Sequence, residues 1–149
     1  MRRRRVKITG IGPVTPAGIG RDAFWRGIQE PVSHVRPFTK LGEEWGPFIA
    51  GQVDDAELIA ISEEIAATYP RHLARHSLFG AAAAALAIKD SGISPAELKR
   101  MASAIVVGTS VMDFGSISHA IRSVAKKGLR GVFPRVVTTA NVTHVATAI

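Results

Sequence analysis

Short apolar runs alternate along this chain with longer segments whose apolar residues have helical spacing. Three short runs predict strands, at residues 6–9, 48–53 and 104–107. The first and third are predicted to be buried, and each ends at a glycine. Four longer segments predict helices: residues 21–28, 54–68, 71–91 and 114–127. A strand, then helices, then another strand is typical of an α/β layer with parallel strands.

Local start and stop signals support these boundaries. Helix starts are predicted from capping side chains at Asp22, at Ser94 with Glu97, and at Asn141. Helix ends are predicted at Pro70, Gly92 and Gly128. The Ser94 signal predicts a short helix to residue 100, and the Asn141 signal predicts a last helix over 141–149. Residues 31–47, with scattered prolines and glycines, predict a loop.

The glycines after the first predicted strand do not form a dinucleotide-binding motif. A G-x-G-x-x-G series that starts at Gly10 and Gly12 has Thr15 where the third glycine is needed. Pro13 also interrupts the helix start that must face a pyrophosphate. We therefore predict a turn that carries the chain away from the strand end.

Composition predicts one globular domain over residues 1–149. The chain is 46% hydrophobic, with a mean hydropathy of +0.16, so it can fill a core. No uninterrupted apolar run approaches the roughly 20 residues of a membrane span. Residues 2–5 are arginines, but the segment behind them is broken by lysine, glycine and proline, so we predict no signal peptide and a cytoplasmic protein.

The net charge of +7 favours acidic partners by long-range attraction. Nucleic acid, anionic lipid and an acidic carrier protein share this property, and a solvated basic surface explains the charge equally well. No aromatic residues interleave with the basic ones, and no helix-turn-helix or RNA-binding pattern is present. A nucleic-acid-binding domain is therefore only an outside alternative.

The candidate chemistry is sparse. The chain has no cysteine, which removes disulfides, thiolate metal sites and thiol catalysis together. His72 and His76 have the spacing of two ligands on one helix face, but no acidic residue or cysteine completes a metal site nearby. We predict no metal, no cofactor and no catalytic residue in this chain.

Four stretches, in this order and spacing, resemble the N-terminal part of the β-ketoacyl-acyl-carrier-protein synthases. They are Ile-Thr-Gly-Ile-Gly-Pro-Val-Thr-Pro-Ala-Gly at 8–18, Ile-Ala-Gly-Gln-Val at 49–53, the alanine-rich segment through Lys-Asp-Ser-Gly-Ile at 89–93, and Ile-Val-Val-Gly-Thr-Ser at 105–110. The resemblance implies an α/β fold that is the incomplete first half of a thiolase-like layered fold. It also implies acyl transfer with carbon–carbon bond formation in fatty-acid or polyketide synthesis.

The family's catalytic set, a cysteine nucleophile and two histidines, has no counterpart here. The resemblance places the cysteine shortly beyond residue 149 and the histidines later, and His144 matches no catalytic position. A helix N-terminus suits such a cysteine because its dipole favours the thiolate. We expect the chain alone to be inactive by that mechanism.

The resemblance also implies non-catalytic roles. Val111 takes a gate position of the acyl pocket, and Phe133 lies in a segment near the pocket end and the dimer interface. The residues implied in binding an acyl carrier protein are Arg71, His72, Arg75, Lys126, Lys127 and Arg130. The implied assembly is a homodimer, or a heterodimer with a ketosynthase-like chain.

Alternatives remain open at this point. The chain fits a subunit of a split synthase, a non-catalytic carrier-binding module, or a truncated product with no function of its own. Ala74 and His76 depart from the acidic and aromatic residues that the family often has there. These departures favour a diverged, chain-length-factor-like or specialised member.

Overall fold

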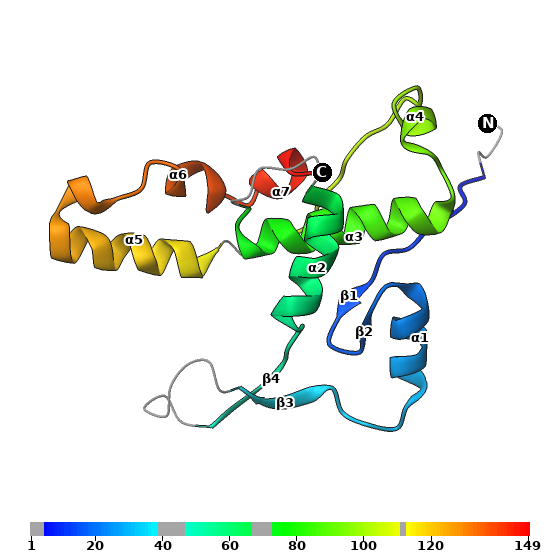
Figure 1. The fold of residues 1–149 in the computed structure, drawn as a ribbon, viewed down its shortest axis with the longest axis horizontal. Helices are drawn as coiled ribbons and strands as arrows, with labels where there is room; N and C mark the ends of the chain where they lie inside the picture. The colour runs from blue at the N-terminus through cyan, green and yellow to red at the C-terminus, as the bar shows by residue number, and fades with distance from the viewer. Residues whose placement is uncertain (1–4, 39–46, 67–72, 111–112) are drawn as a thin grey trace. The chain divides into compact units, whose positions relative to one another are not determined.

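A computed structural model describes residues 5–38, 47–66, 73–110 and 113–149. The chain divides into two compact units, whose helices and strands are labelled in Figure 1. Unit 1 comprises residues 1–61 and 82–101, and unit 2 comprises residues 62–81 and 102–149. Two helices, α2 (Asp55–Ala66) and α3 (Arg75–Ser91), contribute residues to both units.

Unit 1 begins with a tight hairpin at the glycine- and proline-rich sequence. Strands β1 (Val14–Thr15) and β2 (Gly18–Ile19) pair antiparallel, and the Thr15 hydroxyl donates to the Gly18 carbonyl at 3.1 Å. The predicted turn is therefore present. Helix α1 (Arg21–Gln29) follows at the predicted place, but Gly20, with φ of 81°, occupies its N-cap. The prediction that Asp22 caps this helix was wrong, because Asp22 already lies in the first turn.

A second hairpin joins β3 (Val35–Phe38) and β4 (Phe48–Gly51), with Val35 opposite Gly51 and Phe38 opposite Phe48. Strand β4 confirms the predicted strand, although it ends two residues earlier. Strand β3 lies in the segment predicted as a loop. Its Pro37 argues against a strand, but a two-stranded hairpin has only edge strands, which tolerate a missing N–H donor.

The helices after β4 follow the predicted signals closely. Helix α2 matches its prediction, whereas Pro70, its expected stop, lies outside the described residues. Gly92, with φ of 69°, follows α3, as expected for a glycine stop. Helix α4 (Pro95–Leu98) carries the predicted reciprocal cap: the Ser94 side chain accepts from the Glu97 N–H, and the Glu97 carboxylate accepts from the Ser94 N–H. It ends at Leu98, two residues before its predicted end.

Two predicted strands are not strands in the structure. Residues 6–9 and 104–107 lie outside helices and strands, and Val6, Ile8 and Val106 are 90%, 86% and 92% exposed. Apolar, β-branched sequence was the basis of both predictions. A strand also needs a hydrogen-bonding neighbour, and none of the described residues supplies one here.

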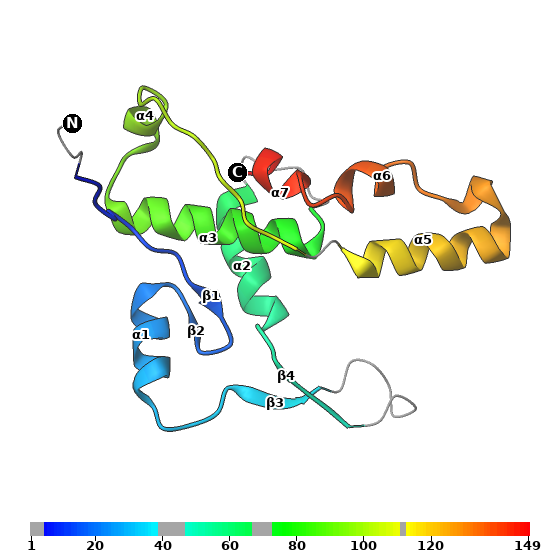
Figure 2. The same cartoon turned by 180° about the vertical axis from the view of Figure 1, so that it is seen from behind.

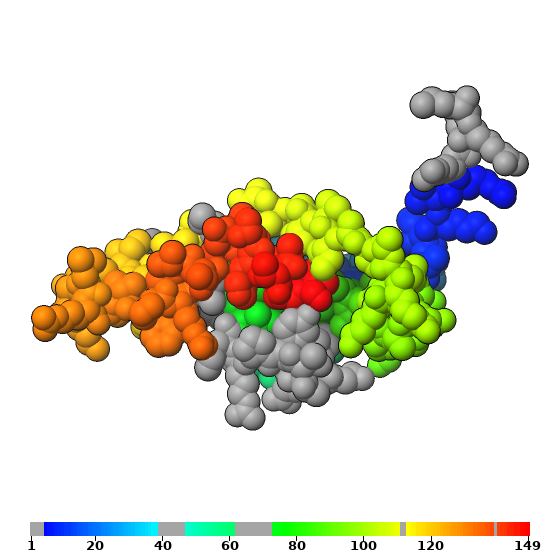
Figure 3. Space-filling view, turned by 90° about the horizontal axis from the view of Figure 1, so that it is seen from above, coloured from blue at the N-terminus to red at the C-terminus, as the bar shows by residue number. Residues whose placement is uncertain are grey.

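Unit 2 contains α5 (Phe114–Lys127), which has the predicted bounds and ends at Gly128 with φ of 64°. After it come a 3₁₀ turn, η2 (Leu129–Gly131), and two short helices, α6 (Val136–Thr139) and α7 (His144–Thr147). The space-filling view shows the orange segment after α5 folded back along that helix (Figure 3). The single helix predicted over 141–149 is only the short α7, and the Asn141 side chain accepts from the Thr143 N–H before it.

The described residues bury few large apolar side chains. The buried apolar residues are Val53, Leu58, Ala74, Ala81, Ala82, Ala140, Val145 and Ala148. Most of them are alanine, so each removes little apolar surface from water. Within the described part of the chain, no helix is both long and apolar enough to span a membrane.

Candidate functional site

A positively charged cluster lies where α5 of unit 2 ends. Lys126 and Lys127 form the last turn of the helix, Arg130 lies in η2, and all three residues are exposed. Gly131 lies tightly against the end of α5: a Cβ added to it would lie 2.8 Å from the Lys127 Cβ and 2.9 Å from the Ser123 carbonyl oxygen. No acidic residue occurs from residue 114 to 149, so nothing in that sequence neutralises the cluster. We call these three residues the basic cluster.

A hollow of about 460 Å³ lies beside α5 in the same unit. Its lining is mainly small and apolar: Gly115, Ser116, His119, Ala120, Gly131, Phe133 and Val136. Phe133 is 68% exposed, so its ring forms one rim of an open hollow. This arrangement fits the predicted pocket role of Phe133, which stays a prediction. Val111, the other predicted pocket residue, lies outside the described residues.

The remaining predicted carrier-binding residues lie on or before α3. The Arg75 guanidinium is 5.2 Å from the centre of the Phe79 ring, a cation–π distance that orients the side chain. Arg75 lies on α3, whereas the basic cluster lies at the end of α5 and in η2. Arg71 and His72 lie outside the described residues. The described residues contain no group of three or more side chains suited to a metal ion.

A polar contact that the sequence did not predict joins α3 and α7 in unit 2. The fully buried Ser77 hydroxyl lies 3.0 Å from Nδ1 of His144. Next to it, Nε2 of His76 lies 3.2 Å from the Asn141 carbonyl, while its Nδ1 is buried without a partner among the described residues. Since 67 residues separate Ser77 from His144, no local pattern could have indicated this pair.

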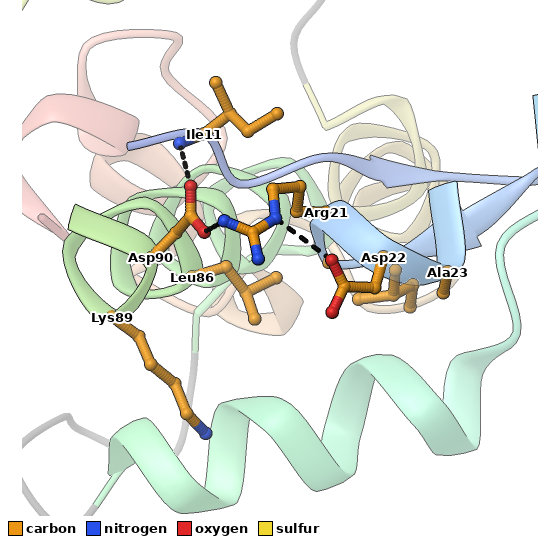
Figure 4. Close-up of a pocket in the computed structure, with 9 residues that line it drawn as sticks. Ile11, Arg21, Asp22, Ala23, Leu86, Lys89 and Asp90 are labelled. Atoms are coloured by element: carbon orange, nitrogen blue, oxygen red, sulfur yellow. Dashed lines mark hydrogen bonds and ion pairs between the residues drawn. The ribbon is translucent and has the colours of Figure 1, made fainter. Parts of the chain in front are cut away.

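In unit 1, Asp90 near the end of α3 joins two other segments of the chain (Figure 4). Its carboxylate accepts from the Ile11 backbone N–H at 3.0 Å and from the Arg21 guanidinium at 2.6 Å. Arg21 also donates to Asp22 at 3.0 Å. The hydrogen bond to Asp22 and the charge of Asp90 raise the pKa of Arg21 above its ordinary value.

These contacts border an open hollow of about 500 Å³, lined by Ile11, Ile19, Gly20, Arg21, Asp22, Ala23, Leu86, Lys89 and Asp90. In Figure 4 the Arg21 side chain lies between the Asp90 and Asp22 carboxylates. The two carboxylates accept from the Nε and one Nη of its guanidinium. We interpret this hollow as the outside of a structural junction that fixes three segments of unit 1.

Two glycines bring the N-terminal segment into direct contact with the α3 backbone. A Cβ on Gly10 would lie 2.2 Å from the Ala87 carbonyl oxygen, and one on Gly12 would lie 2.0 Å from that of Ala83. Figure 2 shows this segment, in blue, passing along α3.

The fold belongs to the layered α/β ketosynthase class. The structure matches "The ishigamide ketosynthase/chain length factor" with a TM-score of 0.79 at 24% identity, covering 99% of this chain and 36% of that one. The family model "Beta-ketoacyl synthase, N-terminal domain" matches residues 3–149. The chain therefore belongs to the β-ketoacyl synthase family, as the resemblance had implied.

Curated relatives come from polyketide and fatty-acid systems. The chain is 35% identical over 96 residues to a protein of Streptomyces halstedii named as a polyketide β-ketoacyl synthase 2, covering 64% of this chain and 22% of the relative. It is 32% identical over 112 residues to the ketoacyl synthase α subunit of the tetracenomycin polyketide synthase of Streptomyces glaucescens, covering 72% and 25%. A mitochondrial 3-oxoacyl-[acyl-carrier-protein] synthase of Schizosaccharomyces pombe is 28% identical over 154 residues, covering 90% and 33%. The chain thus spans about a fifth to a third of the length of these relatives.

Proposed function

We propose that this chain is the N-terminal part of a ketosynthase that performs decarboxylative Claisen condensation in polyketide or fatty-acid synthesis. In this proposal residues 1–149 are one portion of a single domain. The family match over residues 3–149 carries the proposal. The polyketide relatives favour a polyketide system.

The absence of cysteine in these 149 residues determines what the portion can contribute. The condensation needs a thiolate to hold the acyl group and two histidines to assist decarboxylation of the malonyl unit. We propose that another portion of sequence, in the same polypeptide or in a second chain, supplies these groups. The present portion then contributes scaffold, a wall of the acyl pocket at Phe133 and a docking face.

The docking face is the basic cluster. Three exposed cations with no acidic residue in residues 114–149 produce a local positive potential. Such a potential accelerates encounter with an acidic carrier protein and contributes less to its final affinity. Arg71, His72 and Arg75 are proposed to contribute to carrier binding from or near α3.

The proposed assembly includes a second ketosynthase-like chain. One relative is named an α subunit, and the structural neighbour is a ketosynthase/chain length factor. These names favour a heterodimer over a homodimer for this chain. In such a heterodimer, residues 1–149 of this chain contribute no cysteine nucleophile.

A decarboxylation assay tests the catalytic half of the proposal. The purified chain, mixed with acyl-carrier and malonyl-carrier proteins, should release no carbon dioxide above background. Addition of a ketosynthase-like subunit that contains the cysteine should give release that depends on the concentration of the chain. Condensation by the chain alone would contradict the proposal, and so would a subunit whose turnover never responds to it.

A binding assay tests the docking half. Stopped-flow fluorescence anisotropy of a labelled carrier protein should show about tenfold slower association with the Lys126→Glu/Lys127→Glu variant at low salt. The matched control is Lys99→Glu/Arg100→Glu, which makes the same charge change at exposed positions in unit 1. Equal slowing by both variants would contradict a specific docking face and indicate attraction by net charge.

A further inference from the structure

Helix α7 and the turn before it are attached to α3, within unit 2, by a small apolar contact and two polar contacts (Figure 1). In the apolar contact, the buried Val145 packs against Gly80, a position where a side chain would not fit. A helix of four residues has no stability of its own in water. It therefore stays in place only while these contacts with α3 are made.

The first polar contact fixes the protonation state of His76. Its Nε2 lies 3.2 Å from the Asn141 carbonyl oxygen. A carbonyl oxygen only accepts hydrogen bonds, so Nε2 carries the proton and Nδ1 of the neutral ring has a bare lone pair. Among the described residues, this Nδ1 is buried without a partner. The contact therefore fits a neutral His76 in one particular tautomer.

The second polar contact tolerates both states of its histidine. Nδ1 of His144 lies 3.0 Å from the hydroxyl of the fully buried Ser77. A hydroxyl donates to a bare ring nitrogen and accepts from a protonated one, so this bond can persist when His144 gains a second proton. We call the His76–Asn141 and His144–Ser77 contacts together the histidine clasp. Its pH-sensitive half is His76.

A second proton on His76 has to bind to Nδ1. The result would be a positive charge and a buried N–H without an acceptor among the described residues, and both are costly away from water. His76 is only partly buried, so its ring can avoid this cost by rotating into water. That rotation removes Nε2 from the Asn141 carbonyl. Protonation of His76 therefore opens this half of the clasp.

The side chains on the joined segments do not favour a protonated ring. On residues 75–81 of α3 and on residues 132–149, the charged or titratable residues besides His76 are Arg75, Arg135 and His144. The acidic residues of unit 2 are Glu63, Glu64 and Asp113. Of these, Asp113 accepts from the Ser116 N–H at the start of α5. The joined segments thus offer positive charge and no side-chain carboxylate to a protonated His76.

We propose that His76 makes the attachment of α7 to α3 sensitive to pH: the clasp is closed while the His76 ring is neutral and opens when the ring gains a second proton. The open state binds one more proton than the closed state, so acid favours the open state. An imidazole in water titrates near pH 6.5, so the attachment is complete at about pH 8 and weakens as the pH falls toward 5. This inference concerns one contact within unit 2 and does not rest on the proposed function.

Long-range ¹H–¹⁵N NMR of the full chain at about pH 8 tests the closed state. The His76 ring should show a protonated Nε2 and a bare Nδ1. A proton on Nδ1 instead would overturn the proposal, because the Asn141 carbonyl would then have no donor from this ring.

Amide exchange of Ala148 in the full chain, corrected for the intrinsic rate at each pH, tests the opening. The Ala148 N–H donates to the His144 carbonyl within α7, so its protection reports whether α7 is in place. Protection should fall by about tenfold or more between pH 8 and pH 5. Constant protection would overturn the proposal. Protection that rises in acid would also overturn it and indicate a carboxylate partner such as Glu63 or Glu64.

Three variants identify the histidine that responds. His76→Gln keeps an N–H donor but gains no proton, so its protection at Ala148 should be equal at pH 8 and pH 5. His144→Asn should retain the fall in acid. His34→Gln is the matched control, because Nε2 of His34 also lies 2.9 Å from a carbonyl, that of Gly27 in unit 1, and this variant should retain the fall. A fall that survives His76→Gln, or that disappears in either of the other variants, would contradict the assignment.

Discussion

Replacing Gly12 with alanine should destabilise unit 1 more than a single added methyl group ordinarily does. The new Cβ would lie 2.0 Å from the Ala83 carbonyl oxygen and 2.7 Å from the Ala87 nitrogen. These two atoms make one hydrogen bond of the α3 helix, since they belong to residues i and i+4. The added atom would therefore clash with backbone on both sides of a helical hydrogen bond.

The size of the effect follows from that geometry. An ordinary contact at this position is 3.4–4 Å, so the two backbones must separate by about 1.4 Å. Overpacking of this kind costs about 1–3 kcal/mol, and weakening a helical hydrogen bond adds about 1 kcal/mol. We expect a loss of about 3 kcal/mol in the free energy of unfolding. For a chain of this length that loss lowers Tm by about 10 °C.

Urea unfolding followed by far-UV circular dichroism measures this change, with thermal unfolding as a second reading. Gly108→Ala is the matched control, because a Cβ on Gly108 meets no heavy atom within 4 Å among the described residues. That control should stay within about 0.5 kcal/mol of the natural chain. If Gly12→Ala is equally neutral, the N-terminal segment does not lie against α3, and the reasoning is refuted.

Three further changes test other contacts. Ser77→Ala should cost about 1–2 kcal/mol in urea unfolding, because the buried partner of His144 Nδ1 is lost; a neutral result would show that α7 does not depend on this bond. Asp90→Ala should cost about 1–2 kcal/mol by leaving the Ile11 N–H without its acceptor, and Asp90→Asn, which keeps an oxygen there, should cost less; equal losses would contradict that role. Glu97 should titrate below its ordinary pKa of 4.5, because hydrogen bonds from the Ser94 side chain and backbone lower the pKa of that carboxyl. The capping box should therefore stabilise α4 above about pH 4.5 and lose that effect as the pH falls through the lowered pKa. In an NMR titration of the Ser94→Ala variant, the midpoint of Glu97 should move back toward 4.5. An unchanged midpoint would contradict the cap.

Helices and their ends were largely predictable from sequence. Helix α5 has its predicted bounds, Gly92 and Gly128 follow helices with positive φ, and Ser94 with Glu97 makes the predicted reciprocal cap. These features depend on residues within one or two turns of each other, so the local sequence contains all the information that they need. The family resemblance was also carried by local runs of residues, and the family comparison confirmed it.

The strands and the candidate site were less predictable, because both depend on distant residues. Residues 6–9 and 104–107 have strand sequence but no neighbour to pair with, whereas Val35–Phe38 pairs with β4 despite its proline. The basic cluster was visible as three cations in sequence, but its sharp turn and the adjoining hollow depend on Gly131 lying against α5.

By itself, the sequence determined most of the helices, the Ser94–Glu97 cap, the excess of positive charge, the absence of cysteine and the family to which the chain belongs. Tertiary structure decided that Asp90 binds Ile11 across 79 positions and that Ser77 meets His144 across 67. It also decided that the most strand-like segments stay uncovered. The physical reason is that helical hydrogen bonds close within four residues, while strand pairing and side-chain contacts need partners that only the folded chain, or a second portion of the domain, brings near.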